Sequence, residues 1–227
     1  MSGTLRPGQQ WGTEASGPPD LEVAGADAAL ASVVARGLTD PLVRFAAAPD
    51  SDLALAVGLV AGAAATGLAL PLDVLDVVSG DGAEAVKRCA VNSVVVGAAP
   101  DRLRAWHRPA GLSVEIDGAT VEAAKATSLV VMNGQYLRRF DVAPRGHPGD
   151  GVAEAQLYAL PPGARRAMRS RLTTGAHLPH PAITTRKARH VVVRAPHPVP
   201  LEIDGTAAGQ VTALELTLRP AAYRLLV

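Results

Sequence analysis

Cysteine and aromatic residues are scarce in this sequence of 227 residues. The single cysteine, Cys89, excludes an internal disulfide framework and is typical of a reducing compartment, so we expect a cytoplasmic protein. Aromatic residues make up 3% of the chain and hydrophobic residues 48%, so Ala, Val and Leu must fill the core. We expect Cys89 and Trp106 to have structural roles. A net charge of +1 favours neither general nucleic-acid binding nor an acidic scaffold.

An uncharged run between Leu53 and Leu72 raises the question of a membrane span. The run contains a GxxxG pair, but it is rich in Ala and Gly, includes Pro71 and lacks aromatic anchors. We therefore favour a short helix over Asp52–Val57, a Gly-rich loop and then a strand. At most a peripheral contact with membranes is expected.

The first part of the chain alternates strands and helices. The patterns predict a strand at Leu21–Ala24, a helix at Ala28–Arg36, a strand at Leu42–Phe45 and a helix that Ser51 or Asp52 caps. Such alternation is typical of a parallel sheet covered by helices.

After residue 66 the hydrophobic pattern changes to the period of two that is typical of strands. Asp117-Gly118 and Asp204-Gly205 are hairpin-turn signals, and one helix is expected near Ala164–Leu172. The expected strands lie at 68–74, 90–96, 112–117, 120–123, 127–132, 152–160, 190–195, 201–204, 211–218 and 223–227. The sequence thus predicts a two-lobed α+β fold: a partly disordered segment at 1–20, a small truncated Rossmann-like α/β lobe at 21–65 and a larger antiparallel β-sandwich lobe at 66–227.

The turn after the first strand has the layout of a phosphate-binding loop. Its residues are Gly25, Ala26, Asp27, Ala28 and Ala29, so most of the glycines that such loops use are absent. Backbone N–H groups can wrap a phosphate closely only where side chains do not intrude. The added methyl groups therefore predict a poor site for magnesium–ATP.

Six weak motifs, taken in order, resemble those of the diacylglycerol kinase-like lipid kinases, whose fold is shared with NAD kinases and sphingosine kinases. They are the loop at 25–29, the segment 49–54, Asn92, the Asn-Gly element at 133–136, the turn at 144–151 and the Asp-Gly turn at 201–205. The first βα unit of that family has no counterpart in residues 1–20. We therefore expect an N-terminally shortened, degenerate member.

The resemblance implies roles for particular residues. It places the nucleotide at Gly25–Ala29 and Asp52, and it makes Asp204 the base that takes a proton from a lipid hydroxyl. The residue types also allow plainer roles: Asp27 as the N-cap of its helix and Asp204 as the first residue of a hairpin turn.

The resemblance also implies a structural magnesium ion. Asp150 would bind it together with the backbone carbonyls of His147 and Val152, because hard cations prefer oxygen ligands. The alternative is a plain Pro-Gly-Asp-Gly turn.

The segment from Ala155 to Leu201 is basic. It contains no acid, four histidines and eight Lys or Arg residues. It could form a basic face for anionic lipid headgroups or a polyphosphate, or a solvated face balanced by acids elsewhere. Nucleic acid is not expected, because only Tyr158 could stack on a base.

Two functional hypotheses follow. An active protein would transfer the γ-phosphoryl group of ATP, with Mg²⁺, to a lipid hydroxyl, and we expect this activity to be weak or lost. The alternative is a non-catalytic lipid- or nucleotide-binding or regulatory protein on the same fold. Exposed strand edges can pair with a second copy of the chain, so a homodimer is an alternative to a monomer.

Overall fold

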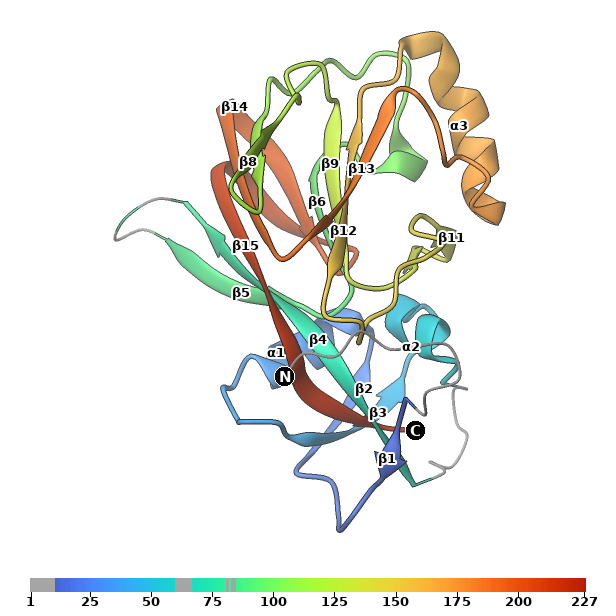
Figure 1. Cartoon of the computed structure of the whole chain (residues 1–227), viewed down its shortest axis with the longest axis vertical. Coiled ribbons are helices and arrows are strands. Elements are labelled where there is room, and N and C mark those ends of the chain that lie inside the picture. Colours follow the sequence, from blue (N-terminus) through green and yellow to red (C-terminus); the bar gives the residue numbers. More distant parts are fainter. Residues whose placement is uncertain (1–10, 60–66, 81, 83–84) are drawn as a thin grey trace.

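The computed structural model describes residues 11–59, 67–80, 82 and 85–227. Figure 1 shows two parts, a smaller one that contains the C-terminal end and a larger one built mostly of strands. The smaller part contains helices α1 (Asp27–Val34) and α2 (Asp52–Val57). Its strands are β1 (Thr13–Glu14), β2 (Leu21–Gly25), β3 (Leu42–Ala47), the start of β4 (Leu68–Ser79) and the end of β15 (Thr206–Leu226).

The sheet of the smaller part is mixed. Strand β2 pairs with β3 in parallel, and β3 pairs in parallel with the end of β15. Strand β15 then pairs with β4, and β4 with β1, both antiparallel. The predicted parallel βα arrangement is therefore present, and Ser51 caps α2 as expected by accepting a hydrogen bond from the Ala54 amide.

The larger part is antiparallel in every strand pairing that the described residues contain. From β15 the order continues β14–β6–β9–β12–β13, and β7 pairs with β14 and β8. The strands are β5 (Val86–Ala90), β6 (Ser93–Gly97), β7 (Ser113–Ile116), β8 (Ala119–Val121), β9 (Ser128–Met132), β10 (Tyr136–Leu137), β11 (Phe140–Asp141), β12 (Ala153–Tyr158), β13 (Ile183–Ala188) and β14 (His190–Ile203). Helix α3 (Arg165–Arg171) covers one end.

The hydrophobic core of the smaller part draws on three regions of the chain. Leu30 of α1, Val43 of β3, Leu72 of β4 and Tyr223 of β15 are buried in one cluster. Strands β4 and β15 extend from this cluster into the larger part (Figure 1). The two parts therefore share continuous strands, and the division at residue 66 stays a prediction.

Some predicted elements differ from those observed. Where one strand was expected at 90–96, the structure has a turn at Val91 and Asn92 between β5 and β6. The backbone amides of both residues donate to the carboxylate of Asp204, which lies far along the chain. The strands expected at 190–195 and 201–204 are one strand, β14, and those at 211–218 and 223–227 are parts of β15. Strand β13 was missed because four consecutive exposed residues hide its alternation.

The uncharged run at 53–72 contains most of α2 and the start of β4, and residues 60–66 lie outside the described part of the chain. Among the helices that the structure describes, none has both the length and the apolar character needed to cross a bilayer.

Candidate functional site

A cleft of about 500 Å³ lies where the two parts meet, beside α1 and the β14–β15 hairpin. Its lining consists of Ala28, Ala31, Ser32 and Ala35 from α1, Lys87, Arg88 and Cys89 from β5, and Ile203, Asp204, Thr206, Ala207 and Ala208 from the hairpin. Cys89 donates its thiol to the Ala31 carbonyl, and burial raises the pKa of Cys89 to about 12, so its role is structural. The charged residues of the lining are two cations and one carboxylate.

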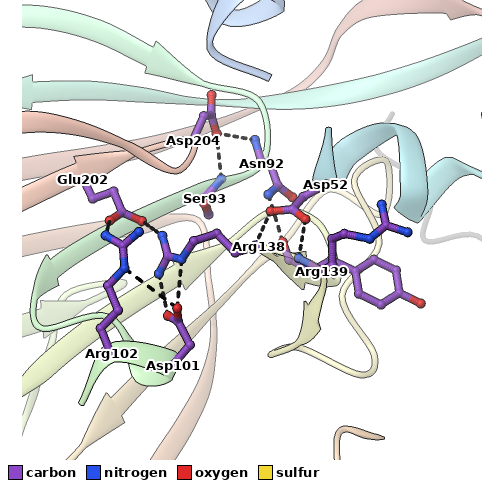
Figure 2. Close-up of polar contacts among 10 residues, drawn as sticks. Asp52, Asn92, Ser93, Asp101, Arg102, Arg138, Arg139, Glu202 and Asp204 are labelled. Carbon is purple, nitrogen blue, oxygen red and sulfur yellow. Dashed lines mark hydrogen bonds and ion pairs between the residues drawn. The ribbon is translucent and has the colours of Figure 1, made fainter. Parts of the chain in front are cut away.

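Asp204 begins the tight turn between β14 and β15, with a φ of 47° that Asp tolerates better than most residues. Its carboxylate accepts hydrogen bonds from the backbone amides of Val91, Asn92 and Ser93, each at 2.9 Å. Figure 2 shows two of these bonds. Three of the four lone pairs on the carboxylate therefore accept backbone donors. Burial outweighs these bonds and raises the pKa of Asp204 to about 7.

Asp27 does not cap its own helix, so the predicted N-cap role is wrong. The N-cap position is Ala26, which makes no side-chain cap, and Asp27 is the first helical residue. Its carboxylate instead accepts bonds from the Ser51 hydroxyl at 2.5 Å and from the amides of Asp52 and Leu53 at 3.2 and 3.1 Å. Asp27 thus caps α2 from a distance. Burial raises the pKa of Asp27 to about 6.

Asp52 connects α2 to the larger part. Its carboxylate accepts hydrogen bonds from the backbone amides of Arg138 and Arg139 in the β10–β11 turn (Figure 2). Both arginines have positive φ, 49° and 63°, a strained conformation that these bonds help to stabilise. Burial raises the pKa of Asp52 above its ordinary value.

An ion-pair cluster adjoins this turn. The Arg138 guanidinium contacts both Asp101 and Glu202, and Arg102 lies 3.5 Å from Glu202 (Figure 2). These pairs raise the pKa of Arg138 despite its partial burial. Sequence reasoning missed the cluster, because its members come from three distant segments and no local pattern connects them.

The loop at Gly25–Ala29 borders the cleft through Ala28. Gly25 has a φ of 131°, and a side chain there would also approach the Ala29 Cβ at 3.1 Å. Glycine is therefore required at the first position. Ala26, Ala28 and Ala29 carry methyl groups at the positions where the sequence indicated them. The structure brings Ala28 and Asp204 to one cleft, whereas the Asp27 and Asp52 carboxylates bind backbone amides nearby.

The residues implied as magnesium ligands lie in one turn. The Asp150 carboxylate accepts the Val152 amide at 3.1 Å and lies 3.7 Å from the Lys187 ammonium group. The His147 carbonyl accepts the Asp150 amide at 3.3 Å. Among the described residues, no group of three or more His, Cys, Asp or Glu side chains is arranged to bind a metal. The magnesium site at Asp150, His147 and Val152 stays a prediction of the family resemblance.

A second carboxylate that sequence reasoning missed is Asp73 of β4. It accepts hydrogen bonds from the backbone amides of Gly151 and Ala221, at 2.7 and 2.8 Å. It thereby ties β4 to the turn before β12 and to the bend in β15. Asp73 and Asp76 are the two charged residues of β4, and a buried position for Asp73 could not be distinguished from the sequence.

A small α/β part joined by shared strands to a larger antiparallel part, with a cleft where they meet, defines the NAD kinase/diacylglycerol kinase-like fold. Residues 76–227 match the family described as "YegS C-terminal NAD kinase beta sandwich-like domain", and the chain belongs to that family. No curated protein sequence matches the chain.

Solved structures agree with this fold. A diacylglycerol kinase from Bacillus anthracis superimposes with a TM-score of 0.69 at 15% identity, over 91% of this chain and 76% of that chain. Yeast NADH kinase in complex with NADH superimposes with a TM-score of 0.57 at 13% identity, over 92% of this chain and 61% of that chain. At such identities the similarity establishes the fold alone.

Proposed function

We propose that this chain binds the polyphosphate of a nucleotide in the cleft beside Asp204, and that phosphoryl transfer from ATP to a lipid hydroxyl is weak or lost. One observation carries the proposal. The three carboxylates that the family resemblance places around the nucleotide, Asp27, Asp52 and Asp204, each accept at least two backbone amide donors. Asp52 connects α2 to the larger part, Asp27 connects α1 to α2, and Asp204 fixes the turn between β5 and β6.

The charges of the cleft favour an anionic ligand. Lys87 and Arg88 line one wall, and the N-terminal turn of α1, with its positive dipole end, lines another through Ala28. Arg88 also donates to the Ala208 carbonyl at 2.9 Å, which directs its side chain across the cleft. The methyl group of Ala28 limits how closely a phosphate can approach the loop backbone, so binding should be weaker than at a glycine-rich loop.

The same contacts disfavour the transfer step. Magnesium bound with ATP would neutralise the phosphate charge that develops during transfer. It would need carboxylate oxygens, but those of Asp27 and Asp204 already accept three donors each. The residues therefore fit the phosphate groups better than they fit the metal.

An active lipid kinase is the second candidate, and one observation favours it. Asp204 lines the cleft and its pKa is raised to about 7, which suits a general base near neutral pH. In that case one remaining lone pair of the carboxylate would accept the proton of the lipid hydroxyl.

Calorimetry with magnesium–ATP tests nucleotide binding. We expect measurable binding to the unmodified protein and about tenfold weaker binding to Lys87→Gln, because one cation is lost next to several phosphate charges. Arg186→Gln is the matched control, since Arg186 is exposed on β13 and does not line the cleft. Absence of heat at millimolar nucleotide, or equal weakening in both variants, would contradict the proposal.

A phosphoryl-transfer assay on the same protein separates the two candidates. Diacylglycerol in mixed micelles is the acceptor, and the rate is measured at nucleotide concentrations that saturate the cleft. The proposal predicts product at the level of the protein-free reaction. Turnover that rises with pH through about 7 would instead support the active lipid kinase, with Asp204 as its base.

A further inference from the structure

The loop between Leu103 and His107 displays a tryptophan to solvent. Trp106 is 76% exposed, more than Leu38 at 48% or Val86 at 45%. The expectation of a structural role for Trp106 is therefore wrong, since its indole packs into no core cluster of the described residues. The exposed indole gains little burial free energy from folding and stays available for contact with another surface.

Arginines from α3 fix the shape of this loop. Arg165 is 3% exposed, and its guanidinium donates to the carbonyls of Arg104 and His107, each at 2.7 Å, and more weakly to that of Ala105. Arg169 donates to the Leu103 carbonyl. A buried guanidinium bound to three carbonyls of one short loop is a costly arrangement that leaves little freedom to its backbone. The loop thus presents Trp106 in a defined position.

The surroundings of Trp106 carry a surplus of positive charge. Arg108 is exposed two residues after Trp106. Arg166 and Arg171 are exposed on α3, the helix that contacts the loop through Arg165 and Arg169. Burial, and then the like charges of Arg104 and Arg166, lower the pKa of Arg169, so cations of the loop and the helix are near one another. The nearby acids Asp101 and Glu202 pair with both Arg138 and Arg102, so these four charges balance one another.

We propose that Trp106 and the exposed arginines Arg108, Arg166 and Arg171, here called the Trp106 patch, dock this protein on an anionic membrane surface. Tryptophan settles at the headgroup level of a bilayer, where its ring meets the acyl boundary and its N–H stays hydrated. Each cation near an anionic leaflet contributes about 1 kcal/mol. The patch combines both interactions.

Other macromolecules fit the patch less well. A stable protein interface buries at least about 1,200 Å² around an apolar centre, whereas this patch offers one indole among guanidinium groups. Single-stranded nucleic acid would need several stacking aromatics. The proposal is independent of the nucleotide proposal, because no residue of the Trp106 patch lines the cleft.

Co-sedimentation with vesicles tests the proposal. We expect the full chain to sediment with vesicles of phosphatidylcholine and phosphatidylglycerol, not with phosphatidylcholine alone, and to be released by high salt. Trp106→Ala and the double variant Arg166→Gln/Arg171→Gln should each bind at least about tenfold more weakly. All three side chains are exposed, so the fold should persist, and circular dichroism checks this.

Leu38→Ala and Arg36→Gln are the matched controls, since both change exposed residues next to α1, outside the patch, and should bind like the unmodified protein. Equal sedimentation of Trp106→Ala and Leu38→Ala would overturn the proposal, as would equal binding to neutral vesicles.

Fluorescence gives a second readout. The chain has two tryptophans, so Trp11→Phe leaves Trp106 as the sole indole. Its emission should shift to shorter wavelength on anionic vesicles and should be quenched by brominated lipid. An unshifted spectrum on vesicles that sediment the protein would show that another surface makes the contact.

Discussion

Charged side chains satisfy backbone groups in opposite ways at two places in this molecule. Where the two parts meet, the carboxylates of Asp27, Asp52 and Asp204 accept backbone N–H groups. Beside α3, the guanidinium groups of Arg165 and Arg169 donate to backbone carbonyls. In both places a buried charge fixes a loop that has no regular ladder of its own.

The two places differ in what remains for a ligand. At the junction each of the three carboxylates already accepts two or three hydrogen bonds, so these acidic residues serve the fold. Beside α3 the buried arginines serve the fold, but their exposed neighbours and Trp106 face solvent. An aspartate or arginine can therefore be assigned to a functional site or to the fold only when its hydrogen-bond partners are known.

The largest effect should come from removing the carboxylate at the junction. Asp204→Ala leaves three buried amides without an acceptor, and we expect a loss of about 3 kcal/mol or more in the free energy of unfolding. Asp117→Ala is the matched control. Asp117 also begins an Asp-Gly hairpin with positive φ, at 49°, and accepts two amides, but it is exposed.

Urea unfolding measures both variants, and we expect less than about 1 kcal/mol for the control, because water can replace the lost acceptor. If both variants lose the same free energy of unfolding, the three amide contacts of Asp204 contribute no more to stability than an exposed Asp-Gly turn does.

Removing the guanidinium beside α3 should have a smaller effect. Arg165→Met keeps most of the apolar volume but leaves the carbonyls of Arg104 and His107 without their donor. We expect a loss of about 2 kcal/mol, since water can reach part of the loop. Arg166→Met, an exposed neighbour on the same helix, should change stability by less than about 0.5 kcal/mol.

Fluorescence anisotropy in the Trp11→Phe background adds a local readout. The Trp106 indole should become more mobile in Arg165→Met and stay unchanged in Arg166→Met. If its mobility is the same in both variants, Arg165 does not hold the loop.

A weaker but more general effect should appear with pH. Asp204 has a pKa of about 7 in the folded state against an ordinary value of 3.8, and that of Asp27 is about 6. The folded state therefore binds more protons than the unfolded state between these values. Stability should be highest at the acidic end and fall as pH rises toward 7, by about 1 kcal/mol per pH unit.

Urea unfolding at a series of pH values measures this slope. Asp204→Asn cannot titrate and should flatten it, whereas Arg165→Met should leave it unchanged. Stability that rises across the same range would show that the carboxylate is ionised in the folded state well below neutral pH.

Local patterns were enough to predict much of the fold. The Asp117-Gly118 and Asp204-Gly205 turns, the parallel unit of β2 and β3, and the Ser51 cap all depend on residues close in sequence. Strand β13 escaped because an edge strand with exposed residues on both faces lacks alternation. The change from one strand at 90–96 to two could not be foreseen, because the turn depends on Asp204, far along the chain.

The candidate site was less predictable than the fold. Asp27, Asp52 and Asp204 could be selected as important from residue type and order, but not their partners, which lie on other elements. Asp27 shows this directly: a helix-start aspartate suggested a cap on α1, and the structure uses it on α2. Trp106 was expected to have a structural role, and only the three-dimensional course of its loop exposes it.

The central claim is that the carboxylates at the junction maintain the fold while the cleft still accepts a nucleotide. The most direct measurement is the rate of phosphoryl transfer from ATP to diacylglycerol at nucleotide concentrations shown by calorimetry to fill the cleft. The account predicts bound nucleotide and no product above the protein-free reaction. Sustained turnover by the unmodified protein, abolished in a folded Asp204→Asn variant, would contradict it.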